Sequence, residues 1–325
     1  MKELIKIFSI LALIALPFVS CSSDDDSTTT PPVKNTIATI ASNNADLSIL
    51  VQALQKTDLV ATLDGSQEFT VFAPTNASFT AFLQANGFAN LDAVPTNVLK
   101  EILLNHVVAG ELTASALNTG YVKTLAKGSA SPTNTLSLFV NTANGVVLNG
   151  GTSNNGGTVV TADVQASNGV VHVINGVLAL PTIVNHAVAN PNFSILVQAL
   201  TREDQPDFAG ILSGTANSPF TVFAPTNEAF VNLLAELNLS GLADVPQGVL
   251  ENTLKYHVVT GANVLSTNLT AGNVTTFQGQ DITIGLTGGA KITDANNRIT
   301  NIIATDVQSS NGVIHAIDQV LLPAL

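Results

Sequence analysis

The chain carries two patterns of apolar residues, one with helical spacing and one with strand spacing. Residues 47–54 place leucine or valine at i, i+3, i+4 and i+7, which is one face of an amphipathic helix. A similar stripe over 99–103 continues toward His106. From about Tyr121 onward apolar and polar residues alternate, as in 136–140, and this spacing indicates strands. An order in which helices come first and a mainly antiparallel sheet follows predicts an α+β fold.

A strand that leads directly into a helix is predicted in the first third of the chain. The run Phe69 to Ala73 is typical of a buried strand, and Pro74 ends it. Thr75 or Asn76 is then placed to accept the first free amides of a helix that carries Phe79 inward.

These blocks occur twice, so an internal repeat is the strongest signal in the sequence. The matching blocks are 48–54 with 194–200, 69–76 with 220–227, and 163–170 with 306–313. A period of roughly 145 residues indicates a duplicated domain rather than a short solenoid repeat. We therefore expect one domain over 34–181 and a second over 182–325, where Thr226 and Asn227 take the places of Thr75 and Asn76.

The start of the chain has the layout of a secretory signal peptide. Lys2 and Lys6 give a positive beginning, and an apolar run covers residues 7–19. This run is shorter than the roughly 20 residues that a membrane-spanning helix needs. Residues 18–21, Phe-Val-Ser-Cys, resemble a bacterial lipobox, although phenylalanine stands where leucine is usual. The resemblance implies cleavage after residue 20 and acylation of Cys21, with an ordinary cleaved signal peptide as the alternative.

Residues 21–33 are polar and acidic, and they predict a flexible tether between the lipid and the first domain. Stable anchoring needs more than one acyl chain, because a single chain binds a membrane only marginally. The three aspartates at 24–26 resemble the surface-export signal of some Gram-negative lipoproteins. We expect the protein in the outer membrane, facing outside the cell; the alternative faces the periplasm.

Composition narrows the function classes. The 325 residues include 23 acidic and 11 basic side chains, a net charge of −12, and one cysteine. An acidic chain without a basic stripe does not suit a nucleic-acid partner. A single cysteine excludes a disulfide framework and a cysteine-based metal cluster. Only 10% of the residues are charged, which leaves few groups for an acid–base active site.

Two sequence boxes, each present in both copies, resemble those of the fasciclin domain family. They are Thr70 to Phe79 with Thr221 to Phe230, and Asn168 to Leu178 with Asn311 to Leu321. The resemblance implies a β-wedge flanked by helices, found in secreted or surface-anchored proteins and associated with adhesion. It implies no shared catalytic activity.

Between the boxes the family often has a Tyr-His pair. The second copy has Tyr256-His257 here, whereas the first has Asn105-His106. The resemblance makes this neighbourhood a candidate partner-binding site, because it is implicated in binding in some animal relatives. Tyr256 lies one helical step, about 100°, from the inward-facing His257 and is expected to be partly exposed. The second copy is therefore the favoured binder.

The paired histidines have a structural interpretation and a chemical one. They are His106 and His257 at the end of a helical stripe, and His172 and His315 on a strand. The structural interpretation is an imidazole that packs inward and bonds a backbone group. The chemical alternative is a metal site or ligand contact, but His-x-x-x-His and His-Glu-x-x-His spacings are absent.

Asp163 and Asp306 are the carboxylates that precede His172 and His315 in the sequence. Each precedes an Asn-Gly pair, 168–169 or 311–312, that suits a tight hairpin turn. Turn capping is therefore the expected role of both aspartates.

No catalytic motif is present. Gly-x-Ser-x-Gly is absent, and Glu101 and Glu251 lie on predicted helices without an obvious second carboxylate. The glycines at 150–151 and 156–157 lack a following Lys-Ser/Thr and fit hairpin loops better than a phosphate cradle. The sequence thus predicts no catalytic residue, no metal and no cofactor.

The resulting expectation is a lipid-anchored surface protein that mediates adhesion by binding an extracellular matrix protein or a glycan. Two alternatives stay open. One is a cell-envelope lipoprotein that captures a glycan or small ligand without enzymatic activity. The other is a hydrolase, motivated only by the repeated histidines and aspartates.

Overall fold

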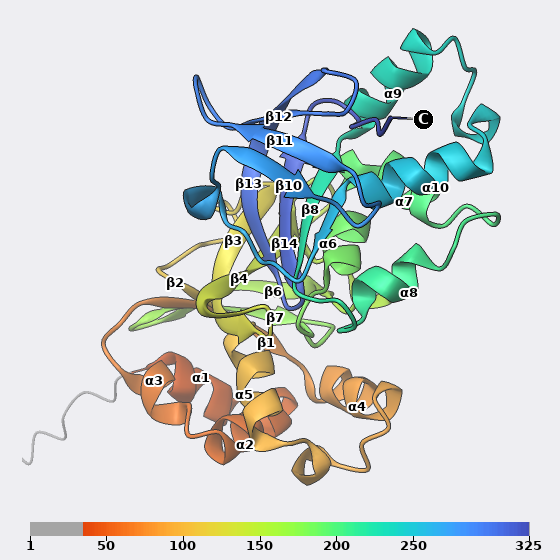
Figure 1. Cartoon of the computed structure of the whole chain (residues 1–325). Coiled ribbons are helices and arrows are strands. Elements are labelled where there is room, and N and C mark those ends of the chain that lie inside the picture. The colour runs from red at the N-terminus through yellow and green to blue at the C-terminus, as the bar shows by residue number, and fades with distance from the viewer. Residues whose placement is uncertain (1–34, 325) are drawn as a thin grey trace, which may run out of the picture. The chain divides into compact units, whose positions relative to one another are not determined.

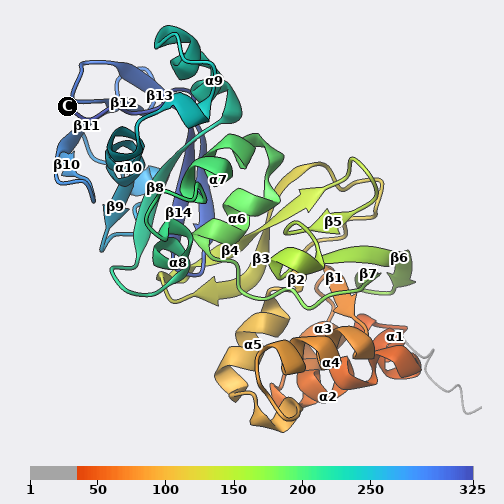
Figure 2. The same cartoon turned by 90° about the vertical axis from the view of Figure 1, so that its right-hand side faces the viewer.

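A computed structural model describes residues 35–324 of the chain (Figures 1 and 2). The predicted signal peptide, Cys21 and the tether lie outside the described residues. None of the helices within 35–324 has the length and apolar character needed to span a bilayer.

The first repeat places its helices around one side of a β-barrel (Figure 1). The helices are α1 Ile37–Asn43, α2 Ser48–Lys56, α3 Val60–Asp64, α4 Asn76–Ala85 and α5 Thr96–Leu104, with short 3-10 turns η1 Ala45–Leu47, η2 Leu91–Ala93 and η3 Thr152–Asn154. The strands are β1 Phe69–Pro74, β2 Val107–Ala109, β3 Gly120–Gly128, β4 Ser131–Asn141, β5 Val147–Leu148, β6 Gly157–Ala166 and β7 Gly169–Ile174. The predicted order of helices first and strands later is confirmed.

The second repeat has the same succession of α-helices and strands. Its helices are α6 Ile183–Ala189, α7 Ser194–Leu200, α8 Phe208–Ser213, α9 Asn227–Glu236 and α10 Gln247–Tyr256, with η4 Pro191–Phe193, η5 Leu242–Asp244 and η6 Ser266–Asn268. Its strands are β8 Phe220–Pro225, β9 Val258–Thr260, β10 Gly272–Thr275, β11 Asp281–Gly285, β12 Lys291–Thr293, β13 Ile299–Ser309 and β14 Gly312–Ile317. Its third 3-10 turn, η6, lies earlier than η3 does, between β9 and β10, whereas η3 lies between β5 and β6.

Strand pairing is antiparallel throughout each sheet except at one ladder. The first barrel runs β1-β2-β3-β4-β5-β6-β7 and closes through β1 and β7, which pair in parallel. The second sheet runs β10-β11-β12-β13-β14-β8-β9, with β14 and β8 parallel in the equivalent place. Alternation of side chains along one strand does not reveal the direction of its neighbour, so this parallel pair was not predictable from the pattern.

In the first sequence box, the residue between the strand and the helix caps the helix. Thr75 accepts a hydrogen bond from the amide of Ser78 at 3.2 Å and caps α4. The Asn76 side chain instead accepts the amide of Ile49 at 2.9 Å and donates to the carbonyl of Ala45 at 2.9 Å. Asn76 therefore fixes the start of α4 against α2. Thr226 and Asn227 take the same positions at α9.

The hairpin that leads into β7 turns one residue earlier than the Asn-Gly pattern predicts. Ser167 and Asn168 form the turn, and Gly169 already pairs with Ala166 and with Phe69. A Cβ on Gly169 would collide with the Phe69 backbone, and its φ of +132° lies in the region that favours glycine. The Asn168 side chain accepts the amide of Ile37 at 2.9 Å, so it ties the turn to α1.

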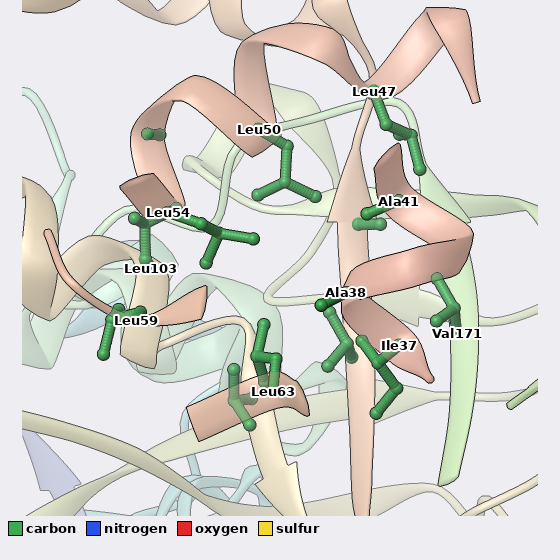
Figure 3. Close-up of a cluster of buried hydrophobic side chains, with 14 of the residues drawn as sticks. Ile37, Ala38, Ala41, Leu47, Leu50, Leu54, Leu59, Leu63, Leu103 and Val171 are labelled. Carbon is green, nitrogen blue, oxygen red and sulfur yellow. The ribbon is translucent and has the colours of Figure 1, made fainter. Parts of the chain in front are cut away.

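Each repeat buries one core between its helices and sheet and another inside the sheet. Figure 3 shows the first of these, where Ile37 of α1 lies beside Val171 of β7 and Leu50 and Leu54 come from α2. The predicted apolar face of α2 is thereby confirmed. Full burial of one such side chain stabilises the fold by about 1.5–3 kcal/mol.

Backbone hydrogen bonds join the β3–β4 hairpin of the first repeat to the β13–β14 turn of the second. The amide of Ala130 donates to the carbonyl of Ser310 at 2.9 Å, and the amide of Ser310 donates to the carbonyl of Pro181 at 2.7 Å. The amide of Gln308 donates to the hydroxyl of Ser137 at 3.0 Å.

Polar side chains from both repeats also meet at the same junction. The Lys123 ammonium donates to the Asp306 carbonyl at 2.8 Å, and partial desolvation there lowers the pKa of Lys123. His186 is fully buried with its ring 5.5 Å from that of Tyr121. Burial lowers the pKa of His186 to about 3, against a smaller opposing contribution from the backbone of Gln308. His186 is therefore neutral in the folded protein at ordinary pH.

Candidate functional site

The histidine after α5 joins that helix to the end of the first repeat. His106 Nδ1 donates to the carbonyl of Ile102 at 2.7 Å, and its Nε2 accepts the amide of Leu178 at 2.9 Å. Burial lowers the pKa of His106 to about 4, so the ring is neutral at pH 7. Both nitrogens are thus used to join two backbone segments that lie far apart in the sequence.

The second repeat has the same arrangement. His257 Nδ1 donates to the carbonyl of Thr253 at 2.7 Å, and Nε2 accepts the amide of Leu321 at 2.9 Å. The pKa of His257 is again lowered by burial to about 4. Equal geometry in both copies gives the two histidines a common structural role.

The strand histidines are held in the same manner. His172 Nε2 donates to the carbonyl of Leu112 at 2.8 Å, its Nδ1 accepts the amide of Asp163 at 3.2 Å, and its ring stacks on Phe72 at 5.5 Å. His315 has equivalent bonds to Val264 at 2.8 Å and Asp306 at 3.4 Å, and a stack on Phe223 at 5.8 Å. All four paired histidines therefore have both ring nitrogens bonded to backbone.

Asp163 and Asp306 do not cap the hairpin turns, contrary to the sequence prediction. They lie at register shifts within β6 and β13, with φ values of 58° and 62° that Asp tolerates better than most residues. The Asp163 carboxylate accepts the amide of Ala114 at 2.7 Å, and that of Asp306 accepts the amide of Ser266 at 2.7 Å and its hydroxyl. Each aspartate thus holds the loop that follows the short strand β2 or β9.

The expectation of a partly exposed Tyr256 is wrong. Its side chain has 0% of its surface exposed, because the helix end packs against β11. The hydroxyl donates to the Asp281 carbonyl at 2.7 Å and accepts the Ala295 amide at 3.1 Å. Burial raises the pKa of Tyr256. A residue enclosed in this way offers no side-chain surface to a partner.

Asn105 replaces the tyrosine in the first repeat and is buried as well. Its amide nitrogen donates to the carbonyls of Leu178 at 3.2 Å and Ala179 at 3.0 Å. Its oxygen accepts the hydroxyl of Thr124 at 3.2 Å. The Tyr/Asn difference is therefore a difference in how each helix end is fixed.

The remaining candidate residues are those that could bind a metal ion and the helix carboxylates Glu101 and Glu251. Within 35–324, no three His, Cys, Asp or Glu side chains gather in a group that could hold a metal ion. Glu101 accepts the amide of Lys127 at 2.7 Å, whereas Glu251 forms an ion pair with Lys255 at 2.6 Å. The bond from Lys255 lowers the pKa of Glu251. These carboxylates have local structural partners.

A groove of about 510 Å³ in the second repeat was not predicted from the sequence. It lies between α9 and the start of β13, two elements that lie close together at the top of Figure 2. We call it the second-repeat groove and define it by Glu228, Glu236, Arg298, Ile299, Ile303 and Asp318. The first repeat has a groove of about 170 Å³ in the equivalent place, beside α4.

Comparing the two copies residue by residue gives the signal that could have found this groove. Ala77, Ala85, Asn155 and Asn175 in the first copy correspond to Glu228, Glu236, Arg298 and Asp318 in the second. Motifs shared by both copies do not include these positions, because only the second copy is charged there.

Comparison with known proteins identifies the repeated unit. The fasciclin domain matches residues 45–181 and again 191–323. The solved structure of a FAS1 domain pair from the insect cell adhesion molecule Fasciclin I is similar, with a TM-score of 0.53 and 21% identity over 85% of this chain and 97% of that one. This likeness shows the predicted α+β fold of two tandem domains.

Relatives come from bacteria and animals. Protein sll1483 of Synechocystis sp. is 41% identical over 45% of this chain and 74% of its own length. Cell surface glycolipoprotein MPB83 of Mycobacterium bovis is 35% identical over 45% of this chain and 62% of its own length. Human periostin is 29% identical over 80% of this chain, which spans only 29% of periostin. The two matches, over 45–181 and 191–323, show that this protein belongs to the fasciclin domain family.

Proposed function

We propose that the protein is a lipid-anchored, surface-displayed adhesion protein that binds an extracellular matrix protein or a glycan through its fasciclin domains. The observation that carries the proposal is the doubled fasciclin domain behind a lipobox-like start. The names of two similar proteins, a cell surface glycolipoprotein and a cell adhesion molecule, support the same assignment.

The histidine geometry supports binding rather than catalysis. A general base needs a ring nitrogen that is free to take a proton from substrate or nucleophile. In each paired histidine both nitrogens already bond to backbone groups. The proposal therefore contains no catalytic step.

A deletion strain tests the adhesion role. We expect cells without this protein to attach less to matrix-coated surfaces and to sister cells, because the displayed domains are then missing. Attachment equal to that of the parent strain on every surface would refute the role.

The anchor and its orientation need their own measurements. Mass spectrometry of the N-terminal peptide is expected to find acylated Cys21, and an unacylated Cys21 would refute lipid attachment. Protease treatment of intact cells is expected to release the folded part if it faces outward. Full protection of the protein, with cleavage only after the outer membrane is opened, would assign it to the periplasmic face.

Capture of a glycan or small ligand is the second candidate, and a small ligand has room in the second-repeat groove, whose volume of about 510 Å³ lies within the usual range for ligand pockets. Thermal-shift screening of the full-length protein against glycans separates the two functions. If a glycan raises the melting temperature of the protein and deletion of the gene leaves cell attachment unchanged, capture is favoured over adhesion.

A further inference from the structure

The second-repeat groove has two walls of different chemistry. Glu228 and Glu236 lie two helical turns apart on α9, whereas Ile299 and Ile303 project from β13 on the other side. The exposed fractions of Ile299 and Ile303 are 58% and 55%, which is high for isoleucine. One wall therefore offers carboxylates and the other offers uncovered aliphatic surface.

The charges in the groove do not cancel. The Arg298 guanidinium forms an ion pair with Glu236 at 3.0 Å. Asp318 accepts the amide and the side-chain nitrogen of Asn301 at 2.8 and 2.7 Å, which leaves its negative charge uncompensated. Within residues 35–324, Glu228 forms no ion pair. Two of the three carboxylates thus have no countercharge, and the groove attracts cations.

The first repeat shows that this charge is not required by the fold. The equivalent groove is lined by alanine, asparagine, glycine and other uncharged residues, and its volume is about one third as large, 170 against 510 Å³. Both repeats nevertheless build the same helix, strands and caps around it.

We propose that the second-repeat groove binds an extended, basic segment of a partner protein, in which lysine or arginine alternates with aliphatic residues. Successive side chains of an extended segment point to opposite sides. Basic side chains would then face Glu228 on α9 while aliphatic ones cover Ile299 and Ile303. This assignment rests on the proposed adhesion function and names the chemistry of its protein partner.

The chemistry of the groove disfavours other occupants. Its lining contains no aromatic ring on which a sugar could stack, and its net negative charge repels nucleic acid and acidic peptides. The carboxylates are not gathered closely enough to form a metal site within the described residues.

The test is peptide binding to the full-length protein in detergent, measured by fluorescence anisotropy. The probe is a short fluorescein-labelled peptide of alternating lysine and valine, compared with its glutamate–valine counterpart. We expect the lysine–valine peptide to bind and the glutamate–valine peptide not to bind. Glu228→Gln and Ile303→Ser are each expected to raise Kd about two- to fivefold, and the double variant about tenfold. Added salt is expected to weaken binding, because the contact is at the surface.

Matched controls lie elsewhere on the same chain. Glu203→Gln removes one exposed negative charge outside the groove, and Val160→Ser removes an equally exposed aliphatic side chain, 56% against 55%, at the equivalent strand position of the first repeat. Both are expected to bind the peptide like the wild type. The groove assignment is overturned if the basic peptide does not bind, or if the control variants weaken binding as much as the groove variants do.

Attachment and peptide binding together distinguish a wrong groove assignment from a wrong proposed function. If attachment depends on the protein but the peptide does not bind, the adhesion role stands and the groove assignment is wrong. If groove variants lose the peptide while deletion leaves attachment unchanged, the groove is a peptide site and the adhesion role is wrong.

Discussion

The two repeats have the same fold and the same buried histidines, but they differ at the groove beside α4 and α9. His106 and His257 bond equivalent backbone groups at the same distances, 2.7 and 2.9 Å. The grooves instead differ in charge and in volume. The shared histidines therefore maintain the fold, whereas the groove, where the copies differ in charge, carries the candidate contact with a partner.

Acidification should affect both repeats together and gives the largest expected effect. Burial lowers the pKa of His106 and His257 to about 4 and that of His186 to about 3. The unfolded chain binds these protons near its ordinary pKa of about 6.5. Stability is therefore fully present above pH ~6.5 and falls, as pH drops toward ~4, by about 1.4 kcal/mol per pH unit for each histidine. Urea unfolding across this range measures the slope.

A flat stability profile between pH ~6.5 and ~5 would contradict neutral burial of these rings. Of the two tyrosines of the chain, Tyr256 lies inside the second repeat, whereas Tyr121 packs at the junction against His186. Their fluorescence therefore follows unfolding of the second repeat and of the junction.

Removing either helix-end histidine should cost a similar amount in the two repeats. His106→Ala and His257→Ala each leave a buried amide and carbonyl without their partner and create a cavity. We expect each substitution to lower the free energy of unfolding by about 3 kcal/mol. Denaturant midpoints of the full-length variants measure the loss. If one variant is near neutral while the other unfolds, the two sites are not equivalent.

Tyr256 and Asn105 should be important for stability even though they differ in type. Tyr256→Phe leaves the Ala295 amide and the Asp281 carbonyl without their hydrogen bonds, and we expect a loss of about 1–2 kcal/mol. Asn105→Ala should cost about as much, because it removes bonds to the carbonyls of Leu178 and Ala179. Thermal melts test both variants. Loss of cell attachment by Tyr256→Phe at unchanged stability would restore a direct binding role for the tyrosine.

His186 lies on α6 at the junction and has no histidine counterpart in the first repeat, where Ile40 stands at the equivalent position of α1. Its replacement gives the smallest expected change. Within residues 35–324, neither of its ring nitrogens forms a hydrogen bond of normal geometry. His186→Leu removes this desolvated polar group, so we expect a gain of about 1 kcal/mol at neutral pH and a shallower pH slope. A loss of stability would show that the ring has a partner that the leucine cannot replace.

The fold could be predicted largely from the sequence because local signals and the repeat agreed. The stripe over 47–54, the Pro74 stop and the Thr75 cap each act within a few residues. The parallel pairing of β1 with β7 joins residues about 100 apart, such as Phe69 and Gly169, and no local pattern specifies it. The one-residue shift of the turn at Asn168 has the same origin, because the asparagine side chain is used to hold α1.

The candidate site was less predictable. The inward packing of Tyr256 depends on β11 and on the loop at Ala295, which helix periodicity does not reveal. Asp163 and Asp306 were placed near the correct turns, but their partners lie about 40 to 50 residues earlier, at Ala114 and Ser266. The groove required a comparison of the two copies at positions where they disagree.

The most direct test of the proposed function is attachment of the deletion strain carrying either the wild-type chain or Cys21→Ala. Both chains contain the same fasciclin domains, so they differ in the anchor alone. The wild-type chain should restore attachment to matrix-coated surfaces, whereas Cys21→Ala should leave cells unattached although the folded domains are exported. Equal attachment with both chains would contradict lipid-anchored adhesion.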